Sequence, residues 1–404
     1  MLTNTQRPAG ALEARYPNSS LKFKLFYGVV DSLLGIFHTG ARDSIVAFRP
    51  RSILLVNIGH LGDVLIATSV LPVLRRAFPD AKIGFLVGSW SLAVVRAHPQ
   101  IDWIHCVDHY RLNRSTGSVL SKLWRYAKTW HAALQEIRRR RYDVAINLFS
   151  KPNVIGLLWQ VRIPVRIGYN SGGLGPLLTH SHRWVPSTRP MAAYHLDLLT
   201  SLGIESPDKP RYELRNPGKE ATVLTSSMLQ SASLEPNGYV VVHMGTGEPQ
   251  REWPRDKWRG LAAKLREGAY PVVLTGSGEQ ETLNAAWITA NTQGCIDFCG
   301  KMDWDAFVSI VSKARLVFCV ESVASHVAAA VNVPCVAVWS GITAPALFRP
   351  LGKRSVAITA PVPCVPCYRG CAGMECVRDV EVTEVYERGI LLMRSNEGSS
   401  SELS

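Results

Sequence analysis

The hydrophobic pattern of this chain alternates between short apolar runs and longer runs with a helical period. In the first half, the short runs predict buried strands at 52–58, 82–88, 103–108 and 143–148. The longer runs predict helices at 63–78, with a bend at Pro72, and at 118–141. Strands that alternate with helices indicate a parallel sheet whose faces are covered by helices.

A second series of the same kind begins at residue 238. Strands are predicted at 239–245, 270–276, 315–320 and 334–340, and helices at 256–267, 279–290, 304–314 and 322–331. The predicted fold class is therefore α/β, with two Rossmann-like doubly wound domains in tandem. Ligands of such folds bind beyond the carboxyl ends of the strands, and we expect the two domains to face each other across a cleft.

Composition divides the chain into five parts. The predicted domains are 49–205 and 238–393, and the second of them ends in a cysteine-rich segment. Between them, 206–237 is rich in Pro, Ser, Asn, Lys and Glu without a sustained apolar period, which predicts a linker. An amphipathic extension at 1–48 comes first, and a disordered tail is predicted at 394–404.

The N-terminal extension contains an amphipathic stripe that allows two interpretations. Lys22 and Lys24 lie at its start, and its apolar members are Leu21, Leu25, Phe26, Val29, Val30, Leu33, Leu34 and Phe37. The stripe either packs on its own domain or rests as an interfacial helix on an acidic membrane. Its apolar run is too short to cross a bilayer core of about 30 Å. The N-terminus lacks the layout of a secretory signal, so we expect a cytoplasmic protein, peripheral on the inner membrane if the stripe binds lipid.

The formal net charge of +13 indicates an anionic partner, such as nucleic acid, acidic lipid or a phosphorylated small molecule. The basic run 138–141 ends a predicted helix, where it complements the helix dipole. No aromatic residues are interleaved with it and no groove-reading motif is present, so nucleic acid is not an expected partner.

The first candidate site is the stretch NIGHLGDVL, which joins a predicted strand to a predicted helix. Gly59 and Gly62 permit a tight loop around His60, and Asp63 follows at the start of the helix. Asp63 either caps that helix or acts as a base. An acid at this point would repel phosphate, which favours a neutral ligand such as a hydroxyl group.

The second candidate site opens the second domain, in HMGTGEPQREWP. Gly245 and Gly247 free the backbone after a predicted strand. Thr246, Arg251 and Lys257 offer a hydroxyl group and two cations to an anion such as phosphate. The alternative is a solvated turn with ordinary surface charge.

Two further stretches of the second domain extend this candidate site. Glu321, Ser322 and Val323 lie where a strand gives way to a helix, whose positive end is available to a diphosphate. His326, one turn later, is either a packed imidazole or a ligand-binding group. Gly300 and Lys301 follow a short strand and are expected to line the same cleft.

Four cysteines cluster near the C-terminus, at Cys364, Cys367, Cys371 and Cys376. Four thiols within thirteen residues could ligate a structural zinc ion, although zinc sites usually divide their ligands between two more distant pairs. A reduced cluster or a labile disulfide is the alternative.

Taken together, these stretches resemble glycosyltransferase family 9, whose known members include ADP-heptose:lipopolysaccharide heptosyltransferases. The resemblance runs from Arg51 to Met393 and rests on the first two sites, on the stretch from CGKMDWDAF to CVAVW, and on the cysteine-rich tail. It implies a GT-B fold, with the acceptor in the first domain and the nucleotide-sugar donor in the second. It also implies inverting sugar transfer to a lipopolysaccharide or other lipid-linked acceptor, without a catalytic metal or other cofactor.

Under this resemblance Asp63 is the base, and Arg251, Thr246 and the amides at Ser322 and Val323 stabilise the departing nucleoside diphosphate. The sequence departs from the family at the usual Asp-Ser-Gly, which is Glu321-Ser322-Val323 here, at the usual lysine, which is Arg251, and at a usual proline, which is Met244. These departures favour a different sugar or reduced activity. One alternative is a nucleotide-sugar-binding or assembly protein of the same fold that has lost turnover. The last is a nicotinamide-dependent enzyme, for which the three-glycine fingerprint is incomplete.

Overall fold

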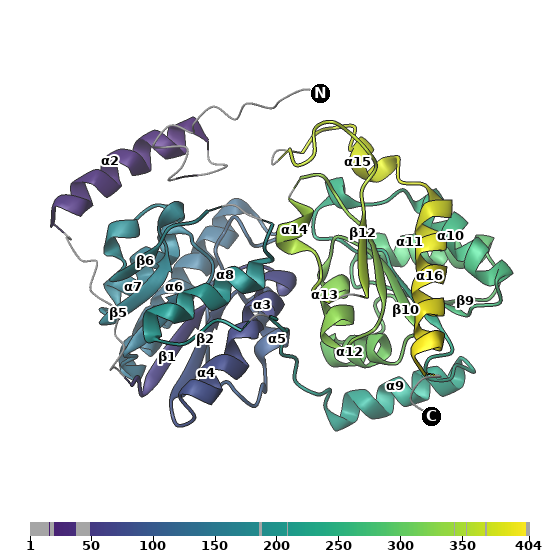
Figure 1. Cartoon of the computed structure of the whole chain (residues 1–404), viewed down its shortest axis with the longest axis horizontal. Coiled ribbons are helices and arrows are strands. Elements are labelled where there is room, and N and C mark those ends of the chain that lie inside the picture. The colour runs from purple at the N-terminus through teal and green to yellow at the C-terminus, as the bar shows by residue number, and fades with distance from the viewer. Residues whose placement is uncertain are drawn as a thin grey trace. The chain divides into compact units, whose positions relative to one another are not determined.

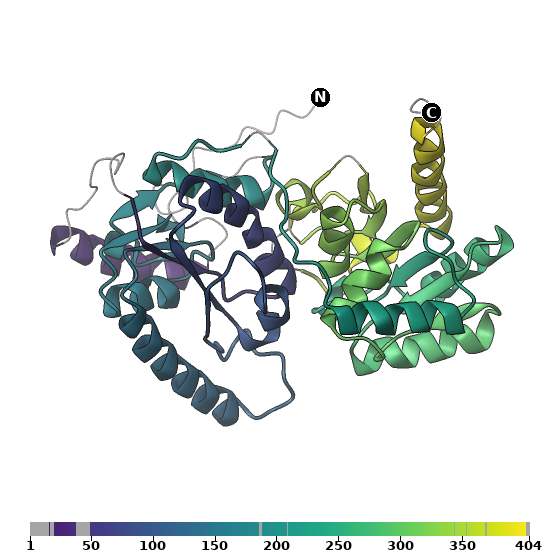
Figure 2. The same cartoon turned by 90° about the horizontal axis from the view of Figure 1, so that it is seen from below.

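The computed structural model describes residues 16, 20–37, 49–185, 188–207, 209–342, 344–352, 354–367 and 370–400. Contacts divide the chain into two compact units, Met1–Glu213 and Leu214–Ser404. Each unit is built on one parallel six-stranded sheet (Figures 1 and 2). Within the described ranges, no helix is both long enough and apolar enough to span a membrane.

The sheet of the first unit has the order β3-β2-β1-β4-β5-β6. Its strands are β1 Ser52–Val56, β2 Lys82–Val87, β3 Trp103–Cys106, β4 Val144–Asn147, β5 Val165–Tyr169 and β6 His180–His182. Because β1 and β4 are neighbours that lead into opposite halves of the sheet, the loops after them meet at the topological switch point. A ligand site is expected there.

Helices cover this sheet because its central strands are apolar on both faces. All five residues of β1 are buried, and successive side chains of a strand point to opposite faces. Leu54 and Val56 pack with residues of α6 and α7 in one core. The helices of the unit are α2 Leu21–Phe37, α3 Leu61–Ala67, α4 Leu71–Ala77, α5 Leu92–Val95, α6 Val119–Arg140, α7 Pro152–Gln160 and α8 Met191–Asp197.

The second unit repeats the topology, with the order β12-β11-β10-β7-β8-β9. Its strands are β7 Val240–His243, β8 Val272–Thr275, β9 Cys295–Asp297, β10 Leu316–Val320, β11 Cys335–Val338 and β12 Ser355–Ile358. Its helices are α9 Lys219–Ser231, α10 Arg255–Glu267, α11 Glu279–Asn291, α12 Trp304–Ser312, α13 Val323–Ala330, α14 Pro345–Phe348, α15 Glu375–Arg378 and α16 Val382–Ser400. The switch point lies between β7 and β10.

The predicted fold class, α/β with two doubly wound parallel sheets, is confirmed. The helix predicted at 63–78 is interrupted by a 3-10 turn at Thr68–Val70, and Pro72 lies in the first turn of α4. The basic run 138–141 ends α6, and Arg139 and Arg140 bind Glu136 on the same helix.

The predicted linker 206–237 contains the helix α9 in its second half. This helix buries Ala221, Thr225 and Leu229, one residue per turn, so its apolar stripe is too narrow to stand out in the sequence. Ahead of α9, Arg215 forms an ion pair with Asp305 of α12. The tail predicted to be disordered from 394 is helical as far as Ser400, where α16 ends; residues 401–404 lie outside the described ranges.

Candidate functional site

Asp63 lies at the carboxyl edge of the first sheet, in the third position of α3. Its carboxylate Oδ2 accepts a hydrogen bond of 2.9 Å from the backbone N–H of His60, the residue that precedes the helix. This contact satisfies one of the free amides at the helix N-terminus. The capping role expected for Asp63 is therefore present, and the residue is partly exposed at that edge.

The loop before Asp63 is held from three sides. Asn57 uses its side-chain amide to donate to the Asp63 carbonyl at 3.1 Å, and its Oδ1 accepts from the Gly59 N–H at 3.0 Å. Trp90 Nε1 and the Ser91 hydroxyl both donate to the Gly59 carbonyl, at 2.8 and 2.9 Å. Such fixed contacts pre-organise the loop that carries the acid.

Gly59 leaves no room for a larger residue. A Cβ atom there would come within 2.6 Å of Asp63 Oδ2 and 2.9 Å of Asn57 Oδ1. The glycine therefore lets the backbone approach the carboxylate closely. Gly62 lies within α3 beside Asp63, and the His60 ring lies 6.0 Å from the Trp90 ring.

The sequence reasoning missed Trp90 and Ser91, which follow β2 at the same edge. The signal for them was their position, since both come directly after a buried strand. Asp108, after β3, was also missed; it is fully buried and accepts hydrogen bonds from the Ser89 N–H and hydroxyl and from Arg125 Nε.

In the second unit the structure brings Arg251 and Glu321 together from the loops after β7 and β10. Arg251 Nη1 lies 3.0 Å from Glu321 Oε1, and Arg251 Nε lies 3.2 Å from Glu248 Oε2. Glu321 is buried and also accepts a hydrogen bond from the Ser340 hydroxyl. The cation predicted to face an anion is thus paired with two carboxylates, so an incoming phosphate would have to compete with them.

The start of α13 adds a hydroxyl group and backbone amides to this edge. Ser322 takes the N-cap position of the eight-residue helix, and its Oγ is buried without a hydrogen-bond partner in the described part of the chain. Val323 is the first helical residue. His326 is buried one turn later, where burial lowers its pKa to about 4 and keeps the ring neutral at pH 7.

Gly245 lies at the end of β7 among polar side chains. A Cβ there would come within 2.6 Å of Glu281 Oε1 and 3.2 Å of His243 Nε2. The Thr246 hydroxyl accepts from the Glu248 N–H, and Gly247 is exposed. Glu281, on α11, was missed by the sequence reasoning because the helix lies more than thirty residues away and only the fold brings it close.

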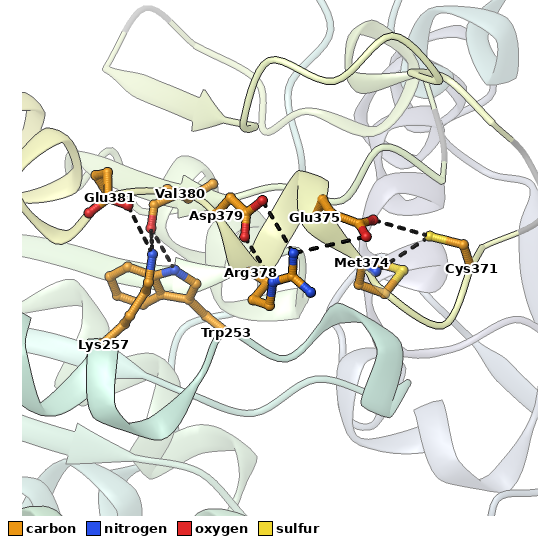
Figure 3. A network of polar contacts seen from close by, with 9 residues as sticks. All are labelled: Trp253, Lys257, Cys371, Met374, Glu375, Arg378, Asp379, Val380 and Glu381. Atoms are coloured by element: carbon orange, nitrogen blue, oxygen red, sulfur yellow. Dashed lines mark hydrogen bonds and ion pairs between the residues drawn. The ribbon is translucent and has the colours of Figure 1, made fainter.

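Lys257 and Lys301 make contacts of their own. Lys257 Nζ donates to the Val380 carbonyl at 2.7 Å and lies 3.4 Å from Glu381 Oε1, which ties α10 to the segment before α16 (Figure 3). Trp253 Nε1 donates to the same carbonyl. Lys301 Nζ donates to the Asp297 carbonyl, and Gly300 has a positive φ of 69° next to it.

The cysteine-rich segment has local polar contacts (Figure 3). Cys371 Sγ accepts from the Met374 N–H at 3.4 Å, and Cys376 Sγ accepts from the Gly341 N–H at 3.3 Å. Burial and the neighbouring thiols, among them Cys364 and Cys367, raise the pKa of Cys376. In the part of the chain that the structure describes, no group of three or more His, Cys, Asp or Glu side chains is arranged to hold a metal ion.

Comparison with known proteins identifies one family. The family model described as glycosyltransferase family 9 (heptosyltransferase) matches residues 130–377. Lipopolysaccharide heptosyltransferase 3 of Escherichia coli is 24% identical over 310 residues, which are 73% of this chain and 85% of that protein.

Solved structures share the fold. The family 9 glycosyltransferase of Veillonella parvula superposes with a TM-score of 0.71 at 19% identity, covering 85% of this chain and 98% of that one. A heptosyltransferase of E. coli solved with ADP gives a TM-score of 0.65 at 18% identity, covering 83% of this chain and 98% of that one.

Proposed function

The chain belongs to glycosyltransferase family 9 and is a glycosyltransferase, and we propose that it transfers a heptose or a related sugar from a nucleotide-sugar donor to a lipopolysaccharide-type acceptor. The relatives' names support this choice, since they include lipopolysaccharide heptosyltransferases and an enzyme that acts with ADP-heptose. The departures at Glu321, Val323 and Arg251 are the reason to keep a related sugar in the proposal.

The observation that carries the proposal is the position of Asp63, a partly exposed residue at the carboxyl edge of the first sheet whose carboxylate is held by the His60 amide. In the proposed reaction this carboxylate takes the proton of an acceptor hydroxyl as its oxygen attacks the anomeric carbon. A new C–O bond forms while the bond from that carbon to the donor diphosphate breaks, which inverts the anomeric configuration. General base catalysis of this kind contributes about 10²- to 10⁴-fold in rate.

The second unit would receive the charge that develops on the leaving nucleoside diphosphate. Arg251, the unpartnered Ser322 hydroxyl and the amides at the start of α13 supply a cation and hydrogen-bond donors there. Fixed donors of this type stabilise the leaving group, so no divalent cation is required in the proposal. Gly245, Thr246 and Gly247 would lie under the phosphates, while Lys257 and Lys301 contribute least because backbone carbonyls already hold their ammonium groups.

A second candidate function has an observation of its own. Arg251 is paired with both Glu248 and Glu321, and Val323 replaces a glycine of the family pattern. Both features would weaken diphosphate binding in the transition state, which favours a protein that binds nucleotide sugars without turnover. The nicotinamide-dependent alternative has no support from the relatives.

We further propose that the enzyme works in the cytoplasm, on the inner membrane, because a lipid-linked acceptor is held in a bilayer. The anionic partner implied by the net charge of +13 is then the membrane surface together with the phosphates of donor and acceptor.

The test is a transfer assay with purified enzyme, a panel of nucleotide sugars that includes ADP-heptose, and truncated lipopolysaccharide acceptors. The proposal predicts release of the nucleoside diphosphate and a mass increase of one sugar on one acceptor, at a rate unchanged by EDTA. A rate that EDTA abolishes and Mg²⁺ restores would overturn metal independence. Calorimetric binding of a donor with no transfer to any acceptor would favour the second candidate.

A further inference from the structure

The N-terminal helix α2 is fixed to the first unit by one of its faces. Asp31 is 1% exposed, and its carboxylate accepts hydrogen bonds from the Tyr16 hydroxyl at 2.6 Å and from the Leu174 N–H at 2.7 Å. Leu34 packs against a small cluster of buried residues from α7 and the segment around Leu177. These contacts set which way the rest of the helix faces.

The opposite face of α2 is apolar and exposed. Six large side chains on it are 53 to 70% exposed, namely Leu21, Leu25, Phe26, Val29, Leu33 and Ile36. At 100° per residue they fall within an arc of about 140°, and Lys22 falls in the same arc. The helix has one acidic residue, Asp31, which lies on the buried face. We call these six residues and Lys22 the α2 face.

The charge of the chain is concentrated in the unit that carries α2. Residues 1–213 hold 27 basic and 13 acidic residues, a net charge of +14, whereas residues 214–404 hold 18 basic and 19 acidic residues, a net charge of −1. An exposed apolar helix face on a strongly basic body is complementary to an anionic lipid surface. A second copy of the chain is a poorer occupant, because pairing through α2 would bring together two units of +14.

The position of α2 places it near the proposed acceptor site. It contacts the 3-10 turn at Gly175–Leu177, in the segment that runs from the carboxyl end of β5 to the amino end of β6. Gly175 lies against Asn170, the first residue after β5, which places the start of this turn at the carboxyl edge of the first sheet. The Tyr27 ring lies against Gly173 in the same segment. Asp63 is at this edge too, two strands away in the sheet order. Figure 1 shows α2 along the outer margin of the first unit.

We propose that the α2 face binds an anionic lipid bilayer and holds the edge that carries Asp63 at the membrane surface. The helix would lie in the interface, with its apolar side chains among the acyl chains and Lys22 at the headgroups. This inference deepens the proposed function by naming the element that brings the enzyme to a lipid-linked acceptor. It rests on the proposed function for the role of membrane binding, whereas the binding itself can be measured without sugar transfer.

The experiment is vesicle co-sedimentation of the full chain without donor or acceptor, so that its result does not depend on sugar transfer. Vesicles of phosphatidylcholine alone are compared with vesicles that contain phosphatidylglycerol, at low and high salt. We expect binding to the anionic vesicles that weakens as salt rises, because screening reduces the attraction to the basic unit.

The decisive variant is the double change Val29→Asp and Leu33→Asp, with Val223→Asp and Leu283→Asp as the matched control, since all four side chains are at least 55% exposed. The α2 variant should lose about tenfold or more in vesicle affinity, and the control should bind like the parent. Equal binding by the α2 variant and the parent would overturn the proposal. A dimer of the parent chain that dissociates only in the α2 variant would also overturn the proposal, because a second copy of the chain would then occupy the α2 face.

Discussion

Asp63 is placed by its neighbours before any substrate binds. One of its carboxylate oxygens caps α3 through the His60 N–H, and the loop beneath it is held by Asn57, Trp90 and Ser91. A fixed carboxylate loses little entropy on reaching its working geometry. The capping contact and the proposed base therefore belong to one arrangement.

Gly59 tests how tightly this arrangement is packed. In Gly59→Ala, the new Cβ would clash with Asp63 Oδ2 and displace the carboxylate. Overpacking of this kind costs about 1 to 3 kcal/mol in the free energy of unfolding. The melting temperature and the transfer rate should both fall. In Gly35→Ala on α2, where a Cβ meets nothing within 4 Å, helix propensity should raise stability by about 0.5 to 1 kcal/mol. An unchanged Gly59→Ala enzyme would show that the loop adapts freely.

Arg251 and Lys257 test the proposed distinction between residues that bind the donor and residues that hold the fold. Arg251→Met removes the cation proposed to face the donor phosphates, so we expect the donor KM to rise about tenfold. Lys257→Met should leave the donor KM unchanged, because its ammonium group contacts Val380 and Glu381. Steady-state kinetics with varied donor measures both. A larger effect at Lys257 than at Arg251 would reverse these assignments.

Among the elements, α2 is attached to its unit through a buried acid, Asp31, together with apolar contacts. Its six exposed apolar residues face outward while Asp31, Leu34 and Tyr27 contact the rest of the unit. A change that loosens the docking of α2 should therefore also change the direction in which the α2 face points. In the second unit, an ion pair between Arg215 and Asp305 ties the segment ahead of α9 to α12.

Asp31→Ala should loosen α2 without unfolding the sheet. The change removes the acceptor of the Leu174 N–H, and leaving that donor unsatisfied costs about 1 to 3 kcal/mol in the stability of the docked helix. The Tyr16 hydroxyl also loses Asp31 but keeps the Tyr27 carbonyl as an acceptor at 3.1 Å. Hydrogen exchange should accelerate in peptides from 21–37 and stay the same in 219–231. Asp31→Asn keeps one acceptor and should show a smaller effect. Unchanged exchange over 21–37 would mean that apolar contacts alone dock the helix.

Elements with strong local signals could be predicted from the sequence, and those set by long-range packing could not. The β1 and β10 runs are continuously apolar, and the glycines around Asp63 mark the strand-to-helix turn. The short edge strand β6, His180–His182, has no apolar run, so it left no signal. Trp90 lies at the first candidate site and Glu281 at the second because other elements pack them there. Spacing along the chain does not encode that packing.

At the scale of the whole molecule, charge and buried imidazoles decide how the protein responds to its surroundings. The basic residues are concentrated in residues 1–213, so salt should affect lipid binding through that unit. Buried histidines occur in both units, among them His105, His195 and His326. Burial lowers the pKa of each of these three to about 4.

Acid should therefore destabilise both units. An unfolded histidine has a pKa of about 6.5 and binds a proton that the folded, buried ring does not, so stability falls as pH drops from about 6.5 to about 4. Urea unfolding at pH 7.5 and pH 5.0 should differ by about 1 to 2 kcal/mol for each ring. His195→Gln should reduce the difference for the first unit. Equal stability at the two pH values would show that the rings are protonated in the folded state.

The most direct test of the central claim is the transfer rate of Asp63→Asn beside that of the parent enzyme. The asparagine side-chain oxygen can still accept from the His60 N–H, so the helix cap persists while the base is lost. The proposed mechanism predicts a kcat reduced by about 10²- to 10⁴-fold with little change in donor KM or melting temperature. Transfer by Asp63→Asn at the parental rate would contradict the mechanism and leave Asp63 as a helix cap alone.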